Sequence, residues 1–231
     1  MHVSIIIQAR LGSKRFPQKM LNIIDNYSII EWVIVRLQRS KLANSIILAT
    51  TLNKEDNALV TIADNLGIKT FRGDEQNVLK RICLAANAVN ADIVVRVCAD
   101  NPFIDAEIVD QLIDYFLHHE IDYAFNHQAR LNSNIADGFG AEILGISLLN
   151  MLNDIVDTPL EQEHATLHIW NNKELFTIGS VPVPEDLAYS EFKFDIDTEE
   201  DLSQLRSLVK DHSLTIDSSA AAFVKAALLN N

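Results

Sequence analysis

The chain has little of several features that define other protein classes. Its two cysteines, Cys83 and Cys98, lack metal-ligand spacing, and we expect both to be small buried apolar residues. No apolar run approaches the roughly 18 residues of a membrane-spanning helix, and the N-terminus lacks the order of a signal peptide. Cations are few, with 19 Lys and Arg against 32 Asp and Glu. The sequence therefore argues against a membrane or nucleic-acid partner, and it predicts a cytoplasmic location.

The apolar residues, by contrast, are plentiful and regularly placed. They make up 48% of the 231 residues, enough for one domain with an ample core. Strand-like apolar runs alternate with helical periodicity over the first half of the chain. This alternation predicts a single α/β domain with a doubly wound, mostly parallel sheet. The expected strands are 3–8, 45–50, 69–71 and 92–97, and the expected helices are 29–37, 57–65, 77–88 and 106–117.

The regular alternation breaks after residue 123. We interpret 123–172 as an insertion that forms a lid and a dimer contact. Within it, the pattern predicts a strand at 140–144 and helices at 147–154 and 160–170. Beyond it, the sequence predicts strands at 175–181 and 191–197, an acidic helix at 199–208 and a surface helix at 218–229.

The loop 8–19 reverses the acidic character of the chain. It follows the first strand and carries Arg10, Lys14, Arg15 and Lys19 within ten residues. Gly12 and Ser13 allow successive backbone N–H groups to turn inward as an anion site. Arginine and lysine side chains can neutralise phosphate oxygens there. The pattern predicts a triphosphate pocket, although it is not a Walker A motif; the alternative is a solvated turn with surface cations.

Six blocks of sequence resemble one enzyme family. IIQARLGSKRFPQKML, FRGDEQNVLKRI, ADIVVRVCADNPFID, DGFGAEI, EQEHATLHI and FDIDTEEDL are similar, in this order, to blocks of the cytidylyltransferases that make CMP-activated acidic sugars. The closest likeness is to the branch of spore-coat polysaccharide proteins. The resemblance implies a homodimeric, Mg²⁺-dependent enzyme that transfers CMP from CTP to the anomeric hydroxyl of a 2-keto-3-deoxy sugar acid. The nucleotide-binding residues that we expect are Ala9, Arg10, Leu11, Gly12, Ser13, Lys19, Arg72 and Gly73.

Asp100 lies three residues after the end of the expected strand 92–97. The carboxyl end of a parallel strand is where α/β proteins place ligands, and Mg²⁺ takes one or two protein carboxylates plus phosphate oxygens. The resemblance places a metal-binding aspartate at this position. The alternative is that Asp100 only caps the turn before Pro102.

Two further acids lie in the expected strand 191–197. Alternation puts Asp195 and Asp197 on one face, about 6–7 Å apart. The resemblance implies that Asp197 is the second metal ligand, with Asp195 as a further candidate. Alternatively, Asp197 or Thr198 caps the helix that follows. The residues expected to carry catalysis are thus Arg10, Lys19, Asp100 and Asp197.

Arg72 and Gly73 follow a short strand. Arg72 would read the base or cover phosphates, and the resemblance supports a nucleotide contact by this block. A helix start capped by Asp74 is the alternative.

The sugar contacts are expected in the insertion. Glu142 and Glu163 would accept hydrogen bonds from sugar hydroxyls or an amine, and Arg130 would meet the carboxylate. His164 could equally be a packing histidine. The expected substrate-binding residues are Asn126, Arg130, Asp137, Glu142, Glu163 and His164.

Three rival interpretations remain at this point. Asp195-Ile196-Asp197 is formally the DxD sequence of a glycosyltransferase. The nucleotide could be GTP or UTP, since base selection can depend on backbone contacts. The chain could also be an inactive nucleotide-binding subunit.

Overall fold

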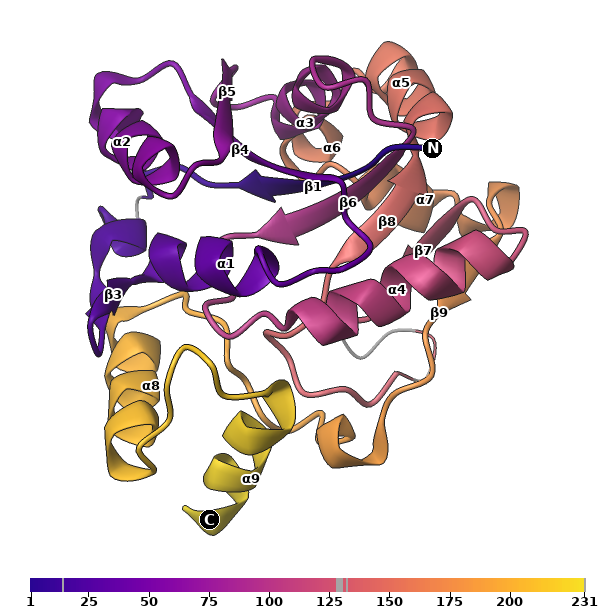
Figure 1. The fold of residues 1–231 in the computed structure, drawn as a ribbon. Coiled ribbons are helices and arrows are strands. Elements are labelled where there is room, and N and C mark those ends of the chain that lie inside the picture. The colour runs from indigo at the N-terminus through magenta and orange to yellow at the C-terminus, as the bar shows by residue number, and fades with distance from the viewer. Residues whose placement is uncertain (14, 128–130, 132, 231) are drawn as a thin grey trace.

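The computed structural model describes residues 1–13, 15–127, 131 and 133–230 (Figure 1). A seven-stranded sheet forms its centre, in the order β5-β4-β1-β6-β8-β7-β9. Only β8 runs antiparallel to its neighbours in this sheet. The prediction of an α/β fold with a mostly parallel sheet is confirmed. The strands are β1 (Val3–Gln8), β4 (Ser45–Thr51), β5 (Lys69–Gly73), β6 (Ile93–Cys98), β7 (Tyr123–Phe125), β8 (Glu142–Gly145) and β9 (Ile178–Ser180).

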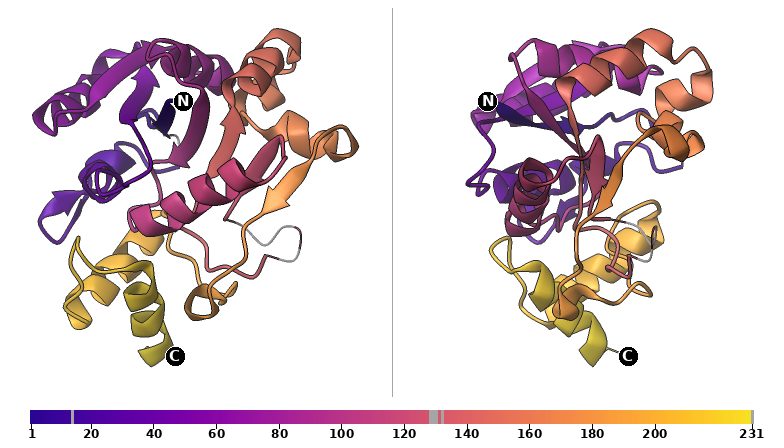
Figure 2. Two further views of the ribbon diagram at one scale, coloured as in Figure 1. Left: turned by 45° about the vertical axis from the view of Figure 1, so that its right-hand side comes forward. Right: turned by 90° about the vertical axis from the view of Figure 1, so that its right-hand side faces the viewer.

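Helices cover both faces of the sheet, as Figure 2 shows. Side chains of β1 alternate between the two faces: Ile5 and Ile7 belong to the larger apolar core, and Ile6 belongs to the smaller one. The larger core is covered by α1 (Ile29–Leu37), α2 (Asn57–Asn65), α4 (Ala106–His118), α8 (Glu199–Asp211) and α9 (Ala220–Leu229). The smaller core is covered by α3 (Val78–Asn87), α5 (Ile146–Ile155) and α7 (Leu167–Asn171), and α6 (Pro159–Glu163) contacts α3.

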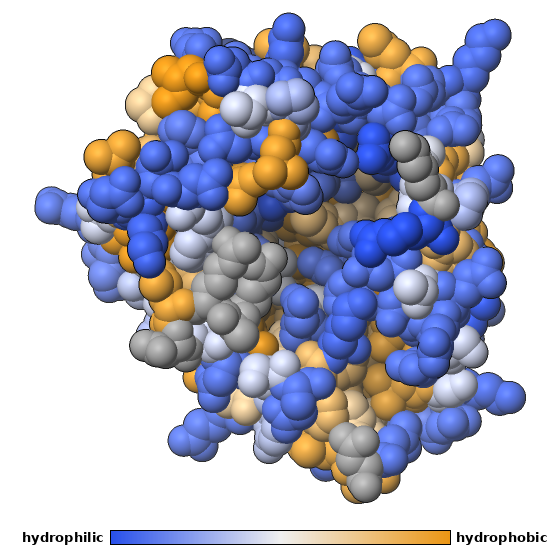
Figure 3. Space-filling view, turned by 180° about the vertical axis from the view of Figure 1, so that it is seen from behind, coloured by the Kyte–Doolittle hydropathy of each residue, from blue (hydrophilic) through white to orange (hydrophobic). Residues whose placement is uncertain are grey.

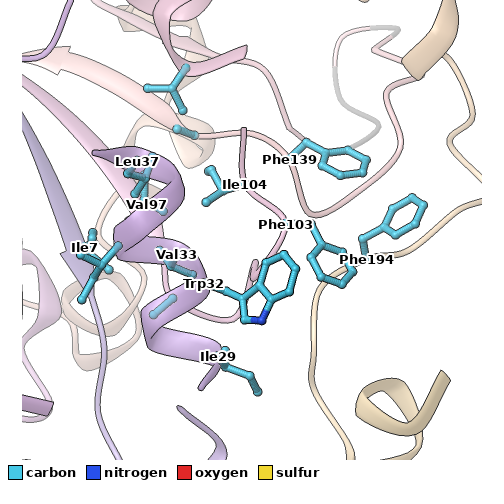
Figure 4. Packing of buried hydrophobic residues seen from close by; sticks show 14 of the residues in the cluster. Ile7, Ile29, Trp32, Val33, Leu37, Val97, Phe103, Ile104, Phe139 and Phe194 are labelled. Atoms are coloured by element: carbon cyan, nitrogen blue, oxygen red, sulfur yellow. The ribbon is translucent and has the colours of Figure 1, made fainter. Parts of the chain in front are cut away.

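An aromatic cluster joins the C-terminal helix to this larger core. Figure 4 shows two of its members, Trp32 and Phe103. Trp32 of α1 meets Phe103 edge to face at 5.3 Å, and Phe223 of α9 stacks on Phe103 at 4.0 Å. Arg36 of α1 adds hydrogen bonds to the carbonyls of Ile104, Ile216 and Ser218. The helix expected at 218–229 is present as α9, with one face buried against α1 and the loop after β6 and with Lys225, Leu228 and Leu229 exposed.

Segment 191–197 is not a strand of the sheet. Its backbone makes an isolated bridge between Lys193 and Asp137, and the N–H of Ile196 donates to the carbonyl of Asp100 at 2.9 Å. These partners lie in two different loops, so the segment runs across loop ends instead of pairing with a strand. The expected helix 160–170 is also divided, into α6 and α7.

Residues 123–172 contribute directly to the central sheet. Strands β7 and β8 come from this segment, and α5 packs against α3. That residues 123–172 form a lid and a dimer contact remains a prediction. None of the helices in the described residues is long and apolar enough to cross a membrane.

Candidate active site

Two adjoining cavities open where β1 and β6 end. The first, here the loop cavity, has a volume of about 740 Å³ and lies between the loop 9–19 and the start of α3. The second, the strand cavity, measures about 650 Å³ and lies above β6 and β8. The two share Gln8, Arg96, Cys98, Asp100, His164 and Asp197 as wall residues. The space-filling view from behind shows a hollow bordered mainly by hydrophilic side chains (Figure 3).

The loop after β1 is folded around Leu11. This residue is buried, its N–H donates to Oδ1 of Asp56 at 2.7 Å, and its carbonyl accepts from the N–H groups of Ser13 and Gln18. Leu11 thus anchors the loop and does not line the cavity. Its expected neighbours do line the loop cavity, namely Ala9, Arg10, Gly12, Ser13 and Lys19. Lys14 lies outside the described residues.

Lys19 joins three segments that are far apart in the sequence. Its side chain is buried, with Nζ 3.3 Å from Oδ2 of Asp100 and 2.6 Å from the carbonyl oxygen of Ile196. Since Ile196 lies between Asp195 and Asp197, this ammonium holds both expected metal-binding regions beside the cation-rich loop. The structure therefore brings together all four residues expected to carry catalysis around the loop cavity.

Arg10 and Arg15 of this loop also face carboxylates. Arg10 lies 3.4 Å from Oε1 of Glu75 and 3.6 Å from Oε1 of Glu163, and Arg15 lies 3.0 Å from Oδ1 of Asp197. These are partly exposed pairs, which contribute little to stability and exchange partners readily. A polyanionic ligand would replace the carboxylates on these cations.

Asp195 has one carboxylate oxygen, Oδ1, that is buried without a hydrogen-bond partner in the described part of the chain. Burial, reinforced by the nearby charge of Asp137, raises the pKa of this carboxyl to about 6. Nζ of Lys193 lies 3.5 Å from Oδ2 of Asp195 and 3.6 Å from Oδ2 of Asp197. Among the described residues no three metal-ligating side chains converge. Asp100 and Asp197 nevertheless fit Mg²⁺, which needs only one or two protein carboxylates when phosphate supplies the rest.

A buried ion pair forms the floor of the strand cavity. Arg96 of β6 contacts Glu142 of β8, and Tyr123 and Thr166 donate hydrogen bonds to the same carboxylate at 2.5 and 2.7 Å. Burial alone would raise the pKa of Glu142, but the Arg96 charge and hydrogen bonds from His127 and Tyr123 hold it well below its usual range. Glu142 is therefore ionised and already supplied with donors.

Several expected site residues are not at the cavities. Arg72 donates to the carbonyls of Thr51 and Asn53 and to Oδ1 of Asn57, each at 2.7 Å, so its guanidinium is turned toward the loop after β4. Asn126 is buried and bonds to the carbonyl of Ile108 and the N–H of Ala141. Neither side chain lines either cavity in this structure, and both bond to neighbouring segments; their expected ligand contacts stay predictions.

Four of the remaining expected site residues line the cavities, and two do not or lie outside the described residues. Gly73 does not line either cavity; a Cβ there would lie 3.1 Å from Cγ of Arg81. Arg130 lies outside the described residues. Of the expected sugar-contacting residues, Asp137 and Glu142 line the strand cavity, Glu163 lines the loop cavity, and His164 lines both.

Comparisons with known proteins agree with this geometry. A family model described as cytidylyltransferase matches residues 4–222. The chain belongs to the cytidylyltransferase family. SpsF of Bacillus subtilis, a spore coat polysaccharide biosynthesis protein, is 29% identical over 227 residues, which are 96% of this chain and 92% of that protein.

Two solved structures extend the comparison. A cytidylyltransferase from Leptospira borgpetersenii superposes with a TM-score of 0.91 at 31% identity, covering 100% of this chain and 95% of that one. The structure of CMP:2-keto-3-deoxy-manno-octonic acid synthetase complexed with CTP gives a TM-score of 0.69 at 17% identity, with coverage of 91% and 99%. At that identity the second likeness shows the fold alone.

Sequence reasoning missed several wall residues of this cytidylyltransferase. Gln8 and Arg96 were detectable, because each is a large polar residue in a mainly apolar strand. In the structure, Nε of Arg96 donates to Oε1 of Gln8 at 2.9 Å. Arg81 was not detectable, since a single arginine on a helix carries no pattern. His127 and Glu75 reach the cavities only through loop geometry.

Proposed function

We propose that the protein transfers CMP from CTP to the anomeric hydroxyl of a 2-keto-3-deoxy sugar acid, for surface polysaccharide biosynthesis. The hydroxyl oxygen attacks the α-phosphorus, the bond from that phosphorus to the bridging oxygen breaks, pyrophosphate leaves and the hydroxyl proton is lost. The observation that carries the proposal is the position of Lys19, whose Nζ contacts Asp100 and the carbonyl of Ile196 at the edge of the loop cavity. Membership of the cytidylyltransferase family supports it.

The triphosphate occupies the loop cavity in this proposal. Arg10 and Lys19 bind phosphate oxygens, the first through its planar fork and the second as a point charge. Both side chains are held against carboxylates in the free protein, so they are already positioned at the cavity wall. Fixed cations at this place stabilise the negative charge that develops on the leaving pyrophosphate.

Asp100 and Asp197 would hold Mg²⁺, with Asp195 as a further ligand. The ion supplies positive charge against the phosphate oxygens when it is bound. The enclosed and unpartnered Oδ1 of Asp195 supports a cationic ligand at this place. The chain's own contribution is to fix the two aspartate-bearing segments to each other through the hydrogen bond from Ile196 N–H to the Asp100 carbonyl.

The acceptor sugar occupies the strand cavity. Asp137, Glu163 and His164 offer hydrogen-bonding groups to its hydroxyls, and Glu142 acts through the arginine and tyrosine that it holds. No protein nucleophile is required, since positioning and charge neutralisation are sufficient for in-line transfer.

A substrate screen tests the proposal. Each of CTP, UTP, GTP and ATP would be combined with a panel of 2-keto-3-deoxy sugar acids and Mg²⁺, with pyrophosphate as the readout. We expect pyrophosphate release with CTP and at least one sugar acid. Release of a nucleoside diphosphate from a nucleotide sugar would indicate a glycosyltransferase instead, and CTP binding without turnover would indicate an inactive subunit.

The protein is a homodimer in this proposal, with residues 123–172 supplying the contact and the lid. Exposed apolar side chains in this segment support the assembly, namely Leu131, Met151, Ile155 and Leu160. Light scattering during size-exclusion chromatography should give about twice the chain mass of 25.9 kDa. A monomeric mass would contradict the dimer and leave the transferase assignment intact.

A further inference from the structure

Lys193 is a lysine surrounded by acidic side chains. Its Nζ lies 3.5 Å from Oδ2 of Asp195 and 3.6 Å from Oδ2 of Asp197. A third carboxylate oxygen, Oδ2 of Asp201, lies at 3.5 Å. One ammonium therefore stands at similar distances from three carboxylates, and two of these belong to the residues expected to bind Mg²⁺.

The backbone fixes Lys193 beside these carboxylates. Residue 193 forms an isolated bridge with Asp137, whose N–H and carbonyl groups bond to the flanking backbone at 3.0 and 2.9 Å. The next residue, Phe194, is buried in the aromatic part of the core (Figure 4). Because side chains alternate along an extended segment, Lys193, Asp195 and Asp197 lie on the side away from this ring.

Asp201 is a permanent partner for the lysine. Its Oδ2 accepts from the N–H groups of Asp197 and Thr198, both at 2.8 Å, and so completes the capping box at the start of α8. These bonds hold the Asp201 carboxylate in the helix cap. Lys193 can therefore stay paired with Asp201 when Asp195 and Asp197 bind another cation.

Lys193 differs in position from the other cations that face the expected metal ligands. Arg15 lies 3.0 Å from Oδ1 of Asp197, and Lys19 lies 3.3 Å from Oδ2 of Asp100. Both cations line the loop cavity, where bound phosphate groups would draw them from these carboxylates. Lys193 is not among the described wall residues of either cavity. Its charge is thus directed at the carboxylates and not at the space for the ligand.

A divalent ion and the Lys193 ammonium require the same carboxylates. An ion bound to Asp195 and Asp197 would lie close to Nζ of Lys193, and two positive charges at such a distance repel each other. The affinity of a metal site also depends on the charge of its ligands, and here the ammonium has already balanced part of that charge. Binding of the ion must therefore displace the ammonium from both aspartates.

We propose that Lys193 is an internal counter-cation of the metal site. It neutralises Asp195 and Asp197 in the free protein, opposes the binding of a divalent ion there, and pairs with Asp201 alone once the ion is bound. This inference rests on the proposed function, because it concerns the metal ligands of the same site. Partly exposed ion pairs each change an equilibrium by about 1.4- to 5-fold, so the loss of two pairs amounts to about 2- to 30-fold.

Binding of Mn²⁺ to the nucleotide-free protein tests the inference, since Mn²⁺ takes the same oxygen ligands as Mg²⁺. Electron paramagnetic resonance of the unbound ion would give the affinities of the wild type, Lys193→Met, Lys193→Arg and Lys210→Met. The last is a matched control, because Lys210 is exposed near the other end of α8. We expect Lys193→Met to bind Mn²⁺ more tightly than the wild type by a factor between about 2 and 30. Lys193→Arg and Lys210→Met keep their charge at position 193 and should stay within about twofold of the wild type.

Three results of this titration would overturn the inference. The first is a Lys193→Met affinity within about twofold of the wild type, or weaker than it. The second is an equal gain in Lys193→Arg, which would show that the charge is not the cause. The third is a gain that persists in the double variant Lys193→Met/Asp197→Asn, because the tighter binding would then lie elsewhere.

Chemical labelling follows the lysine in the wild type itself. The Lys193 side chain is 46% exposed, so an acetylating reagent can reach it, and mass spectrometry would measure its labelling with and without Mn²⁺. We expect Mn²⁺ to increase the labelling of Lys193, because two carboxylates no longer hold the ammonium, and to leave Lys210 unchanged. Asp197→Asn should abolish the increase. Unchanged labelling of Lys193 at saturating Mn²⁺ would overturn the inference, and this measurement decides if Lys193→Met does not fold.

The outcomes also distinguish this inference from the proposed function. Tighter Mn²⁺ binding by Lys193→Met, together with no pyrophosphate release from any sugar acid, would support the inference and contradict the proposed transfer. Pyrophosphate release from CTP with an unchanged Mn²⁺ affinity in Lys193→Met would support the transfer and overturn the inference.

Discussion

Arg96 of β6 and Glu142 of β8 face each other in antiparallel register and form a buried ion pair beneath the strand cavity. Gln8, Tyr123 and Thr166 bond to the same pair from three other segments. The pair therefore connects β6, at whose end the loop cavity lies, to β8, which forms part of the floor of the strand cavity.

Replacement of Glu142 by Gln should be strongly destabilising. The change leaves the Arg96 charge buried without its anion, which costs about 3–5 kcal/mol of the free energy of unfolding. Urea unfolding measures the effect. Glu120→Gln, at an exposed position before β7, is the control and should change stability by less than about 0.5 kcal/mol. A loss below about 1 kcal/mol for Glu142→Gln would contradict the pair's role.

The lowered pKa of Glu142 predicts how the free energy of unfolding depends on pH. Burial opposes ionisation of Glu142, yet Arg96 and the hydrogen bonds hold its pKa well below its usual range in the folded state. Its stabilising contribution is thus fully present above the unfolded pKa of about 4.3, and it is lost as the pH falls through the folded value. The stability difference between wild type and Glu142→Gln should be constant from pH 5 to 7 and shrink in more acid solution. If this difference grew as the pH fell, the pKa of Glu142 would be raised on folding, which would contradict the prediction.

Removal of the Lys19 ammonium should impair use of the triphosphate. Lys19→Met eliminates the cation that contacts Asp100 and the Ile196 carbonyl, and we expect kcat/KM for CTP to fall about 10²- to 10³-fold. Lys225→Met on the exposed side of α9 is the matched control. Steady-state pyrophosphate release checks both variants, and equal rates would remove Lys19 from the site.

Asp100→Asn and Asp197→Asn should each depress turnover by at least about 10²-fold and raise the Mg²⁺ concentration needed for half-maximal rate. The amide keeps the size of the side chain but loses the charge that the ion requires. Mg²⁺ titrations of the rate provide the measurement, with the exposed Asp64→Asn on α2 as control. An unchanged Mg²⁺ requirement would show that these carboxylates do not bind the ion.

The C-terminal helix should matter for stability. Phe223→Ala removes a fully buried ring that stacks on Phe103 and meets Trp32, and we expect a loss of about 3–5 kcal/mol. Leu229→Ala in the same helix is exposed and should cost less than about 0.5 kcal/mol. Thermal or urea unfolding measures both variants. An equal loss of stability in the two would contradict the packing of Phe223 against Phe103 and Trp32.

Local sequence alone determined most of the sheet and the first half of the site. The expected strand 3–8 and helix 29–37 match β1 and α1 residue for residue, because apolar periodicity and the Ser28 cap act within a few residues. Lys19 was identifiable from the density of cations in the loop 8–19, and Asp100 from its place after a buried strand and from the family resemblance. Their positions in the loop cavity agree with that expectation.

Only the tertiary structure decided which side chains reach the cavities. Arg72 and Arg81 are nine residues apart and chemically identical, yet one bonds to the loop after β4 and the other lies on the cavity wall. The segment 191–197 has strand-like alternation but pairs with the Asp137 and Asp100 loops. In each case the deciding partner is a backbone group distant in the sequence or in another element, and local periodicity carries no information about such a partner.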